Sequence, residues 1–148
     1  METFLAYTIG LFFPFKGLNH FKKCIIVDCF NLIDLDDPKN LDQLKKYPAI
    51  VVGHPMGAVK EQSSNLYAQK LAEQGFVTLS LDLSFWGESE GEPRNAVLPD
   101  VYAEDFSAAV DYLGTRPFID REKIGALGIC GSGSFVISAA KIDPRIKA

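Results

Sequence analysis

A six-residue stretch near the end of the sequence has the residue types and spacing that nucleophilic catalysis requires. It covers residues 128–133 (GICGSG) and follows an apolar run, residues 124–129, that predicts a buried strand. A nucleophile elbow lifts its reactive side chain on a sharp strand-to-helix turn and needs small residues two positions to either side. Gly128 and Ser132 occupy those positions, so Cys130 is the candidate nucleophile.

The turn has competing explanations. A dinucleotide-binding fingerprint would need a glycine at position 136, where Val136 stands, and a P-loop would need a following Gly-Lys-Ser/Thr, which is absent. One alternative stays open, namely that Cys130 is an inert core thiol in a tight glycine turn. Against it, the helix expected after the turn would place the thiol at a helix N-terminus, where the dipole favours a thiolate.

The elements that would position this turn can be recognised from Lys45 onward. Short apolar runs bounded by glycine or polar loops predict buried strands, and apolar residues at helical spacing predict helices. The expected strands are residues 49–52, 76–81 and 124–129, and the expected helices are residues 63–74, 99–113 and 134–141.

The side chains expected to pack or cap follow from the same pattern. In the first helix, Ser63 or Ser64 should cap the N-terminus, and Tyr67 and Leu71 should share a face. In the later helices the expected buried side chains are Tyr102, Phe106, Ala109, Val110, Leu113, Phe135, Val136 and Ala139.

The alternation of strands and helices predicts an α/β fold. A strand, a helix and a strand within about thirty residues form a βαβ unit, so the sheet should be parallel with a right-handed crossover. Residues 142–148 resemble the approach to a further strand of the sheet. The sequence shows no internal repeat or linker, so a single domain is expected.

Composition narrows the function classes. A net charge of -4 offers no basic field for nucleic acid. Three cysteines without dense spacing favour a reducing, cytoplasmic location, and Cys24 and Cys29 have no partners for a zinc site, so they are expected to be small buried hydrophobes. The apolar segment 4–15 is too short and too interrupted to span a membrane. No metal, cofactor or membrane association is therefore expected.

Three motifs, in order, resemble those of the dienelactone hydrolase-like group of α/β-hydrolases. Residues 49–57 (AIVVGHPMG) resemble its strand and histidine-glycine loop, residues 82–89 (DLSFWGES) its aspartate-to-glycine-serine loop, and residues 127–133 (LGICGSG) its elbow, which often carries Cys in place of Ser. The resemblance covers residues 36–148 and implies the N-terminal part of an α/β-hydrolase domain, a mostly parallel sheet with flanking helices. Residues 1–35 match poorly.

The resemblance also implies roles for individual residues. It makes Cys130 the nucleophile and the N–H of Gly131 one oxyanion donor; the second donor is assigned to Met56, because Pro55 has no N–H. His54 is expected to order its loop rather than to transfer protons. Ser132 stands where the family motif usually ends in glycine, and is small enough for the elbow.

Two loop residues are expected to have structural roles. Asp82 and Ser89 are expected to cap turns rather than to act in catalysis. The sequence alone leaves it open whether Phe85 and Trp86 line a pocket or simply pack.

The family order of nucleophile, acid and histidine is not completed within the 148 residues, because no histidine follows Cys130 and Asp143 comes too early for the acid. The chain is therefore interpreted as part of a longer hydrolase, incomplete as an enzyme by itself. The expected substrate is a small ester, lactone or related acyl compound. A non-catalytic module and an acyltransferase or peptidase relative are the alternatives. Neither substrate identity nor oligomeric state is predicted.

Overall fold

The computed structural model describes residues 45–147, and all structural statements concern these residues. Cys24, Cys29, His20 and the apolar segment 4–15 lie outside them. The described elements alternate along the chain as β1 (Tyr47–Gly53), α1 (Ser63–Ala72), β2 (Val77–Leu81), α2 (Pro99–Gly114), β3 (Ile119–Gly128) and α3 (Ser132–Ile142).

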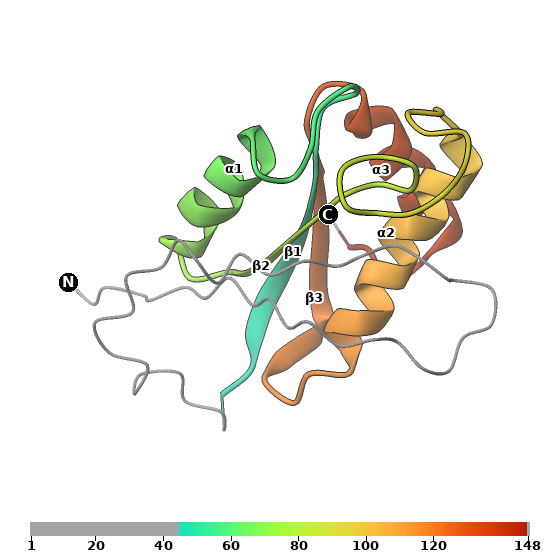
Figure 1. Cartoon of the computed structure of the whole chain (residues 1–148). Coiled ribbons are helices and arrows are strands. Elements are labelled where there is room, and N and C mark those ends of the chain that lie inside the picture. The colour runs from blue at the N-terminus through green and yellow to red at the C-terminus, as the bar shows by residue number, and fades with distance from the viewer. Residues whose placement is uncertain (1–44, 148) are drawn as a thin grey trace.

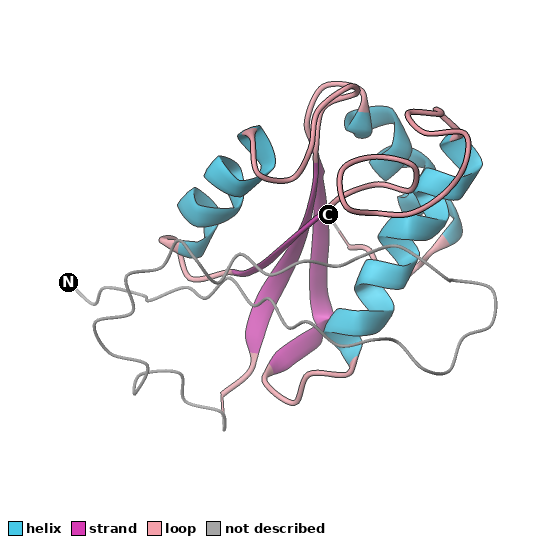
Figure 2. Cartoon of the chain, viewed as in Figure 1, coloured by secondary structure: helices cyan, strands magenta, loops and turns pink. Residues whose placement is uncertain are grey.

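The three strands form one parallel sheet in the order β2-β1-β3. Ile50 pairs with Thr78 on one side and with Gly125 on the other, which places β1 in the centre. The sheet separates two layers of helices: α1 lies on one side, and α2 and α3 lie together on the other (Figures 1 and 2). Beyond β3, Ile146 forms a parallel bridge with Ile124, so the chain again runs alongside the sheet near residue 146.

The α/β fold with a parallel sheet and flanking helices is confirmed. The sequence pattern identified every described strand and helix, and the apolar side chains expected to be buried on α2 are buried, because residues at helical spacing face the sheet. No helix within residues 45–147 is long and apolar enough to cross a membrane.

The expected packing of α1 is wrong. Tyr67 is 49% exposed, and the residue at the N-cap position is Gln62, which makes no side-chain capping bond. The helix buries small and polar residues instead, because it lies close to β2: Ser80 donates a hydrogen bond to Asn65 (2.6 Å), and Thr78 donates to the carbonyl of Ala68 (3.2 Å). Large apolar residues would hold the helix farther from the strand.

Two boundaries also differ from the sequence-based expectation. β3 begins at Ile119, ahead of three exposed charged residues, 121–123, which hide the start of the strand from an apolar pattern. α3 begins at Ser132, two residues earlier than expected, so that the helix starts almost directly after Cys130.

The close approach of α3 to β3 explains the glycine at position 128. A Cβ atom on Gly128 would lie 2.2 Å from the carbonyl oxygen of Ser132 and 2.5 Å from the nitrogen of Gly133. Both are backbone atoms of the first turn of α3, so they cannot move aside without shifting the helix. The small residue that the sequence motif required is therefore imposed by contact between two backbones.

We expect Gly128→Ala to lower the free energy of unfolding by about 3 kcal/mol, the upper end for overpacked sites, because the added methyl group collides with the α3 backbone. The matched control is Gly114→Ala, where the nearest atom to the new methyl group would be 4.0 Å away; it should leave the free energy of unfolding unchanged or raise it by up to about 1 kcal/mol, because alanine favours a helix more than glycine does. Urea unfolding of both variants measures this. Equal effects at the two positions would contradict the steric explanation.

Candidate active site

Cys130 occupies the turn between β3 and α3 with φ of 55°, a left-handed conformation that non-glycine residues rarely adopt. Its thiol is free and exposed. The turn is closed by backbone hydrogen bonds from Ser132 to Ile129 (3.2 Å) and from Gly133 to Cys130 (3.0 Å). The backbone strain at Cys130 therefore accompanies a side chain that faces solvent.

The loop that follows β1 approaches this turn. A Cβ atom on Gly131 would lie 3.0 Å from Cβ of Met56 and 3.5 Å from its backbone nitrogen. Within residues 45–147 neither the N–H of Met56 nor that of Gly131 donates a hydrogen bond to the protein. Their assignment as oxyanion donors, like the role of Cys130, stays a prediction.

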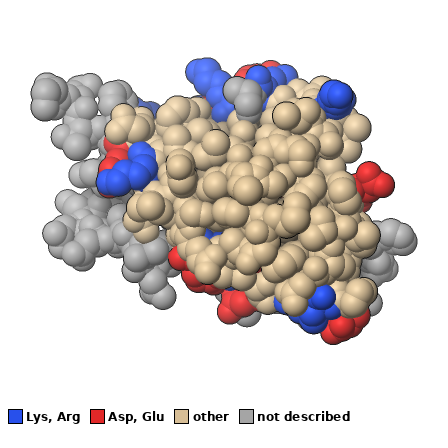
Figure 3. Space-filling model, turned by 90° about the horizontal axis from the view of Figure 1, so that it is seen from above, with Lys and Arg blue, Asp and Glu red and all other residues tan. Residues whose placement is uncertain are grey.

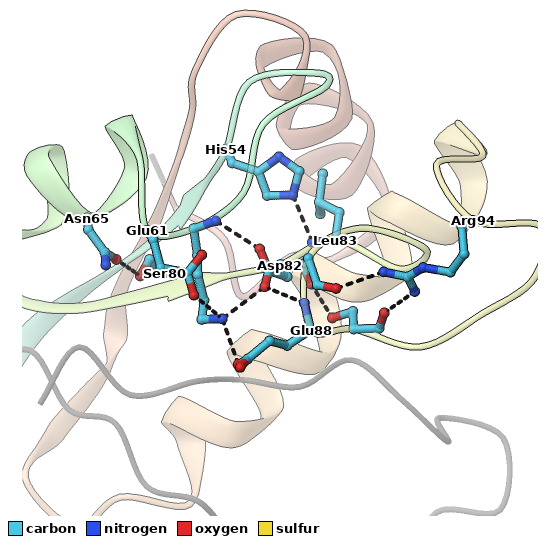
Figure 4. Close-up of polar contacts among 11 residues, drawn as sticks. His54, Glu61, Asn65, Ser80, Asp82, Leu83, Glu88 and Arg94 are labelled. Atoms are coloured by element: carbon cyan, nitrogen blue, oxygen red, sulfur yellow. Dashed lines mark hydrogen bonds and ion pairs between the residues drawn. The ribbon is translucent and has the colours of Figure 1, made fainter.

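His54 orders the loop after β1, as the sequence suggested. Its Nε2 accepts a hydrogen bond from the backbone N–H of Leu83 (3.0 Å), which leaves the proton on Nδ1 to be donated to the carbonyl of Pro55 (2.8 Å). The side chain is buried, and its ring points toward the backbone of Leu83 (Figure 4). Both ring nitrogens are thus engaged in fixing backbone groups.

A buried ion pair joins the loop after β1 to the loop after β2. The carboxylate of Asp82 accepts hydrogen bonds from the backbone N–H and the Nζ of Lys60, at 2.8 and 2.9 Å, and from the backbone N–H of Glu88 at 3.0 Å (Figure 4). Ser89 donates to the carbonyl of Asp82 (2.7 Å). Asp82 and Ser89 thus hold turns, as expected, but Asp82 does so through a partner that the sequence did not reveal.

Lys60 is almost completely buried beneath three carboxylates. Burial disfavours its charged form, but hydrogen bonds to Glu61, Asp82 and Glu88 outweigh this, and the pKa of Lys60 lies above its ordinary value. Gly87 has φ of 53°, and a Cβ atom there would lie 2.2 Å from the Asp82 carboxylate. The glycine lets the second loop close around the ion pair.

A second buried carboxylate anchors the loop after β2 to α2. Asp105 accepts hydrogen bonds from the backbone N–H and the hydroxyl of Ser84, both at 2.8 Å. Burial raises the pKa of Asp105 to about 6, and the two hydrogen bonds from Ser84 only partly oppose this. Sequence reasoning missed Asp105; its position on the buried face of α2, one residue before Phe106, was the available signal.

The aromatic residues of this loop pack rather than stand free. Phe85 and Trp86 lie partly buried against the core. The indole N–H of Trp86 donates to the hydroxyl of Tyr102 (2.7 Å) and the carbonyl of Ala96 (3.0 Å). Trp86 therefore ties the loop to α2 through Tyr102.

The face at the carboxyl ends of the strands is largely uncharged. Seen from above, its centre carries neither acidic nor basic side chains, and these gather at the rim (Figure 3). The loops after β1 and β3 lie at this end of the sheet (Figure 1). In open parallel sheets, ligands bind at the carboxyl ends of the strands.

Comparison with known proteins identifies the family. A sequence model of the dienelactone hydrolase family matches residues 36–148, and the chain belongs to this family. Its fold is accordingly that of the α/β-hydrolases, as the three motifs implied.

Individual relatives agree with this assignment. The chain is 56% identical over 115 residues to an uncharacterised protein, PA2218, of Pseudomonas aeruginosa, covering 78% of this chain and 31% of the relative. The crystal structure of PA2218 superimposes with a TM-score of 0.68 at 57% identity, covering 70% of this chain and 32% of that one. Identity is 50% with YcjY of Escherichia coli (75% and 36% covered) and 40% with thiohydrolase aneE of Aspergillus aculeatus (68% and 31% covered). The chain thus spans about a third of the length of these relatives.

We expect the stability of the protein to fall between about pH 4 and pH 6 because of Asp105. Its pKa is about 6 in the folded state and about 3.9 when unfolded, so in this window the folded state binds more protons and loses stability as pH rises. A shift of about two units corresponds to roughly 3 kcal/mol. Urea unfolding from pH 4 to pH 7 should show this slope, and Asp105→Asn should abolish it.

The control for this prediction is Asp100→Asn, an exposed position on the same helix, which should leave the slope unchanged. If the slope persists in full in Asp105→Asn, Asp105 is not its source.

Proposed function

We propose that the protein belongs to the hydrolases that cleave ester, lactone or related acyl bonds, and that Cys130 is its nucleophile. The observation that carries this proposal is the exposed thiol held at φ of 55° between β3 and α3. Backbone strain at a non-glycine residue is kept where the surrounding structure requires it, and such residues cluster at active sites. A core thiol would be buried instead.

In the proposed reaction the Cys130 thiolate attacks the acyl carbonyl and forms a carbon–sulfur bond. The carbonyl electron pair moves onto oxygen, and the N–H groups of Met56 and Gly131 stabilise that oxyanion. Collapse of the tetrahedral intermediate re-forms the carbonyl, breaks the ester carbon–oxygen bond and expels an alkoxide, which takes a proton from water to become the alcohol. A water molecule then attacks the acyl-enzyme, releasing the acid and regenerating the thiol.

Several observations support this class of substrate. The uncharged centre of the face above the strands suits a neutral acyl compound better than a charged one (Figure 3). One relative, at 40% identity, is named a thiohydrolase. A cytoplasmic location, which we propose with this function, would also suit a thiolate nucleophile, because a reducing compartment protects it from oxidation.

The second candidate is a non-catalytic module that keeps the scaffold alone. The engagement of both His54 nitrogens with backbone groups favours it in one respect, since no histidine of residues 45–147 is then free to serve as a base. The two experiments that follow separate these candidates.

In folded protein, Cys130 should react with limiting iodoacetamide before Cys24 and Cys29, because it is exposed and precedes a helix N-terminus. Mass-spectrometric peptide mapping gives the order of labelling. Cys130→Ala should remove the first adduct. Preferential labelling of Cys24 or Cys29 would rule out Cys130 as the activated thiol.

With p-nitrophenyl acetate, the 148-residue chain should release about one equivalent of p-nitrophenolate in a burst, followed by little turnover. Acylation needs only the thiolate and the oxyanion donors, whereas deacylation needs an activated water, and the ring of His54 is occupied. Stopped-flow absorbance measures the burst, which Cys130→Ala should abolish.

The matched variant is His54→Gln, whose amide can still accept the Leu83 hydrogen bond, and it should keep the burst. Steady turnover in the unaltered chain that is lost in both Cys130→Ala and His54→Gln would show that His54 serves as the base. Absence of any burst in the unaltered chain would favour the non-catalytic module.

A further inference from the structure

Ser132 makes a hydrogen bond that its place in the sequence motif does not require. The residue is fully buried, and its hydroxyl donates to the backbone carbonyl of His54, 78 residues away. The neighbouring serines of α3 behave differently: Ser134 and Ser138 are exposed and donate to carbonyls within their own turn, at 2.8 and 3.1 Å. Ser132 alone among these serines reaches across to the loop after β1.

The His54 carbonyl belongs to the peptide group immediately before the one that carries the Met56 N–H. It belongs to the His54–Pro55 peptide, and the proline ring restricts the next rotation to φ near -65°. The carbonyl of Pro55 accepts from Nδ1 of His54 (2.8 Å) and from the N–H of Ala58 (3.0 Å). The Pro55 carbonyl and the Met56 N–H belong to one planar peptide group, so holding the Pro55 carbonyl also sets the direction of the Met56 N–H.

The hydrogen bond from Ser132 to the His54 carbonyl also fixes the loop after β1 against the turn that carries Cys130. Ile129 donates a hydrogen bond to the carbonyl of Gly53 (3.2 Å), and a Cβ atom on Gly53 would lie 3.1 Å from the Ser132 hydroxyl. Gly131 lies between Cys130 and Ser132 and is the residue that Met56 approaches. The start of this loop is therefore held on both sides of the Cys130 turn: Ile129 binds the Gly53 carbonyl before the turn, and Ser132 binds the His54 carbonyl after it.

We propose that Ser132 is a positioning residue for the oxyanion site: its hydroxyl holds the His54–Pro55 peptide against the first turn of α3 and so sets the Met56 N–H relative to the Gly131 N–H. This inference rests on the proposed function, since it supposes that those N–H groups receive an oxyanion. It gives a function to Ser132, the residue that replaces the usual glycine of the elbow motif in this sequence.

The test compares two reactions of the same thiol. Acylation of Cys130 by p-nitrophenyl acetate passes through an oxyanion, whereas alkylation by iodoacetamide is a direct displacement that forms none. The ratio of the two rate constants therefore reports the oxyanion donors, while changes in thiol exposure or ionisation affect both reactions. The unaltered 148-residue chain should show a higher ratio than N-acetylcysteine.

Ser132→Ala should lower the acylation rate constant at least about tenfold, less than the loss of a whole oxyanion donor, and leave alkylation within about twofold. Ser132→Gly, which restores the usual motif residue, should act in the same direction and guards against a folding defect specific to alanine. Ser138→Ala, an exposed serine on the same helix, should change neither rate. Amide hydrogen exchange in both Ser132 variants should quicken in residues 54–58 and not throughout the sheet.

The outcomes separate the two proposals. A raised ratio in the unaltered chain that survives in Ser132→Ala and Ser132→Gly overturns the role of Ser132 alone. Equal loss of acylation and alkylation also overturns it, because the hydroxyl would then act on the thiol or the fold. A ratio no higher than that of N-acetylcysteine in the unaltered chain overturns the oxyanion site, and the role of Ser132 with it.

Discussion

The buried ion pair between Lys60 and Asp82 is the interaction on which the arrangement of the loops depends. Removing two charges from water costs several kcal/mol for each ion, and only close geometry with further hydrogen bonds offsets that cost. Here the carboxylate accepts from Lys60 twice and from Glu88 once, and Lys60 is held by two further carboxylates. Loss of Lys60 would remove the ammonium group that faces the buried Asp82 carboxylate, whereas loss of Asp82 would leave Lys60 with the more exposed carboxylates of Glu61 and Glu88. The pair therefore sets the distance between the loops that follow β1 and β2.

The remaining contacts extend this arrangement from β2 to β3. His54 joins the loop after β1 to the backbone of Leu83, and Ser132 joins the same loop to the start of α3. Each contact uses a backbone group at the carboxyl end of a strand, where parallel strands bring their loops together. Polar contacts thus link the loops that follow all three strands, and the Ser132 contact holds the turn of Cys130 to the loop after β1. Burial of the apolar core stabilises the fold, whereas the polar contacts fix the positions of the loops at the carboxyl ends of the strands.

The fold was predictable from sequence because its signals are local. Short apolar runs marked the strands, helical spacing marked the buried face of α2, and the spacing around Cys130 marked the turn. The burial of Lys60 and Asp105 was not predictable, since a lysine and an aspartate are ordinarily exposed and only distant partners make their burial possible. Tyr67 was misplaced for a related reason: the closeness of α1 to β2 depends on Asn65 and Ser80 meeting, which no single segment encodes.

The central position of β1 has a consequence for the order in which the molecule folds. β1 pairs with β3 although their paired residues lie about 75 positions apart (for example Val52 with Leu127), so joining them closes a long loop and costs chain entropy before any contact compensates. The Ser132–His54 contact spans 78 residues and forms only when that pairing is complete. The unit β1–α1–β2, whose contacts are nearer in sequence, can form without it. The reactive geometry around Cys130 would then be among the last features to form during folding and among the first lost when the sheet opens.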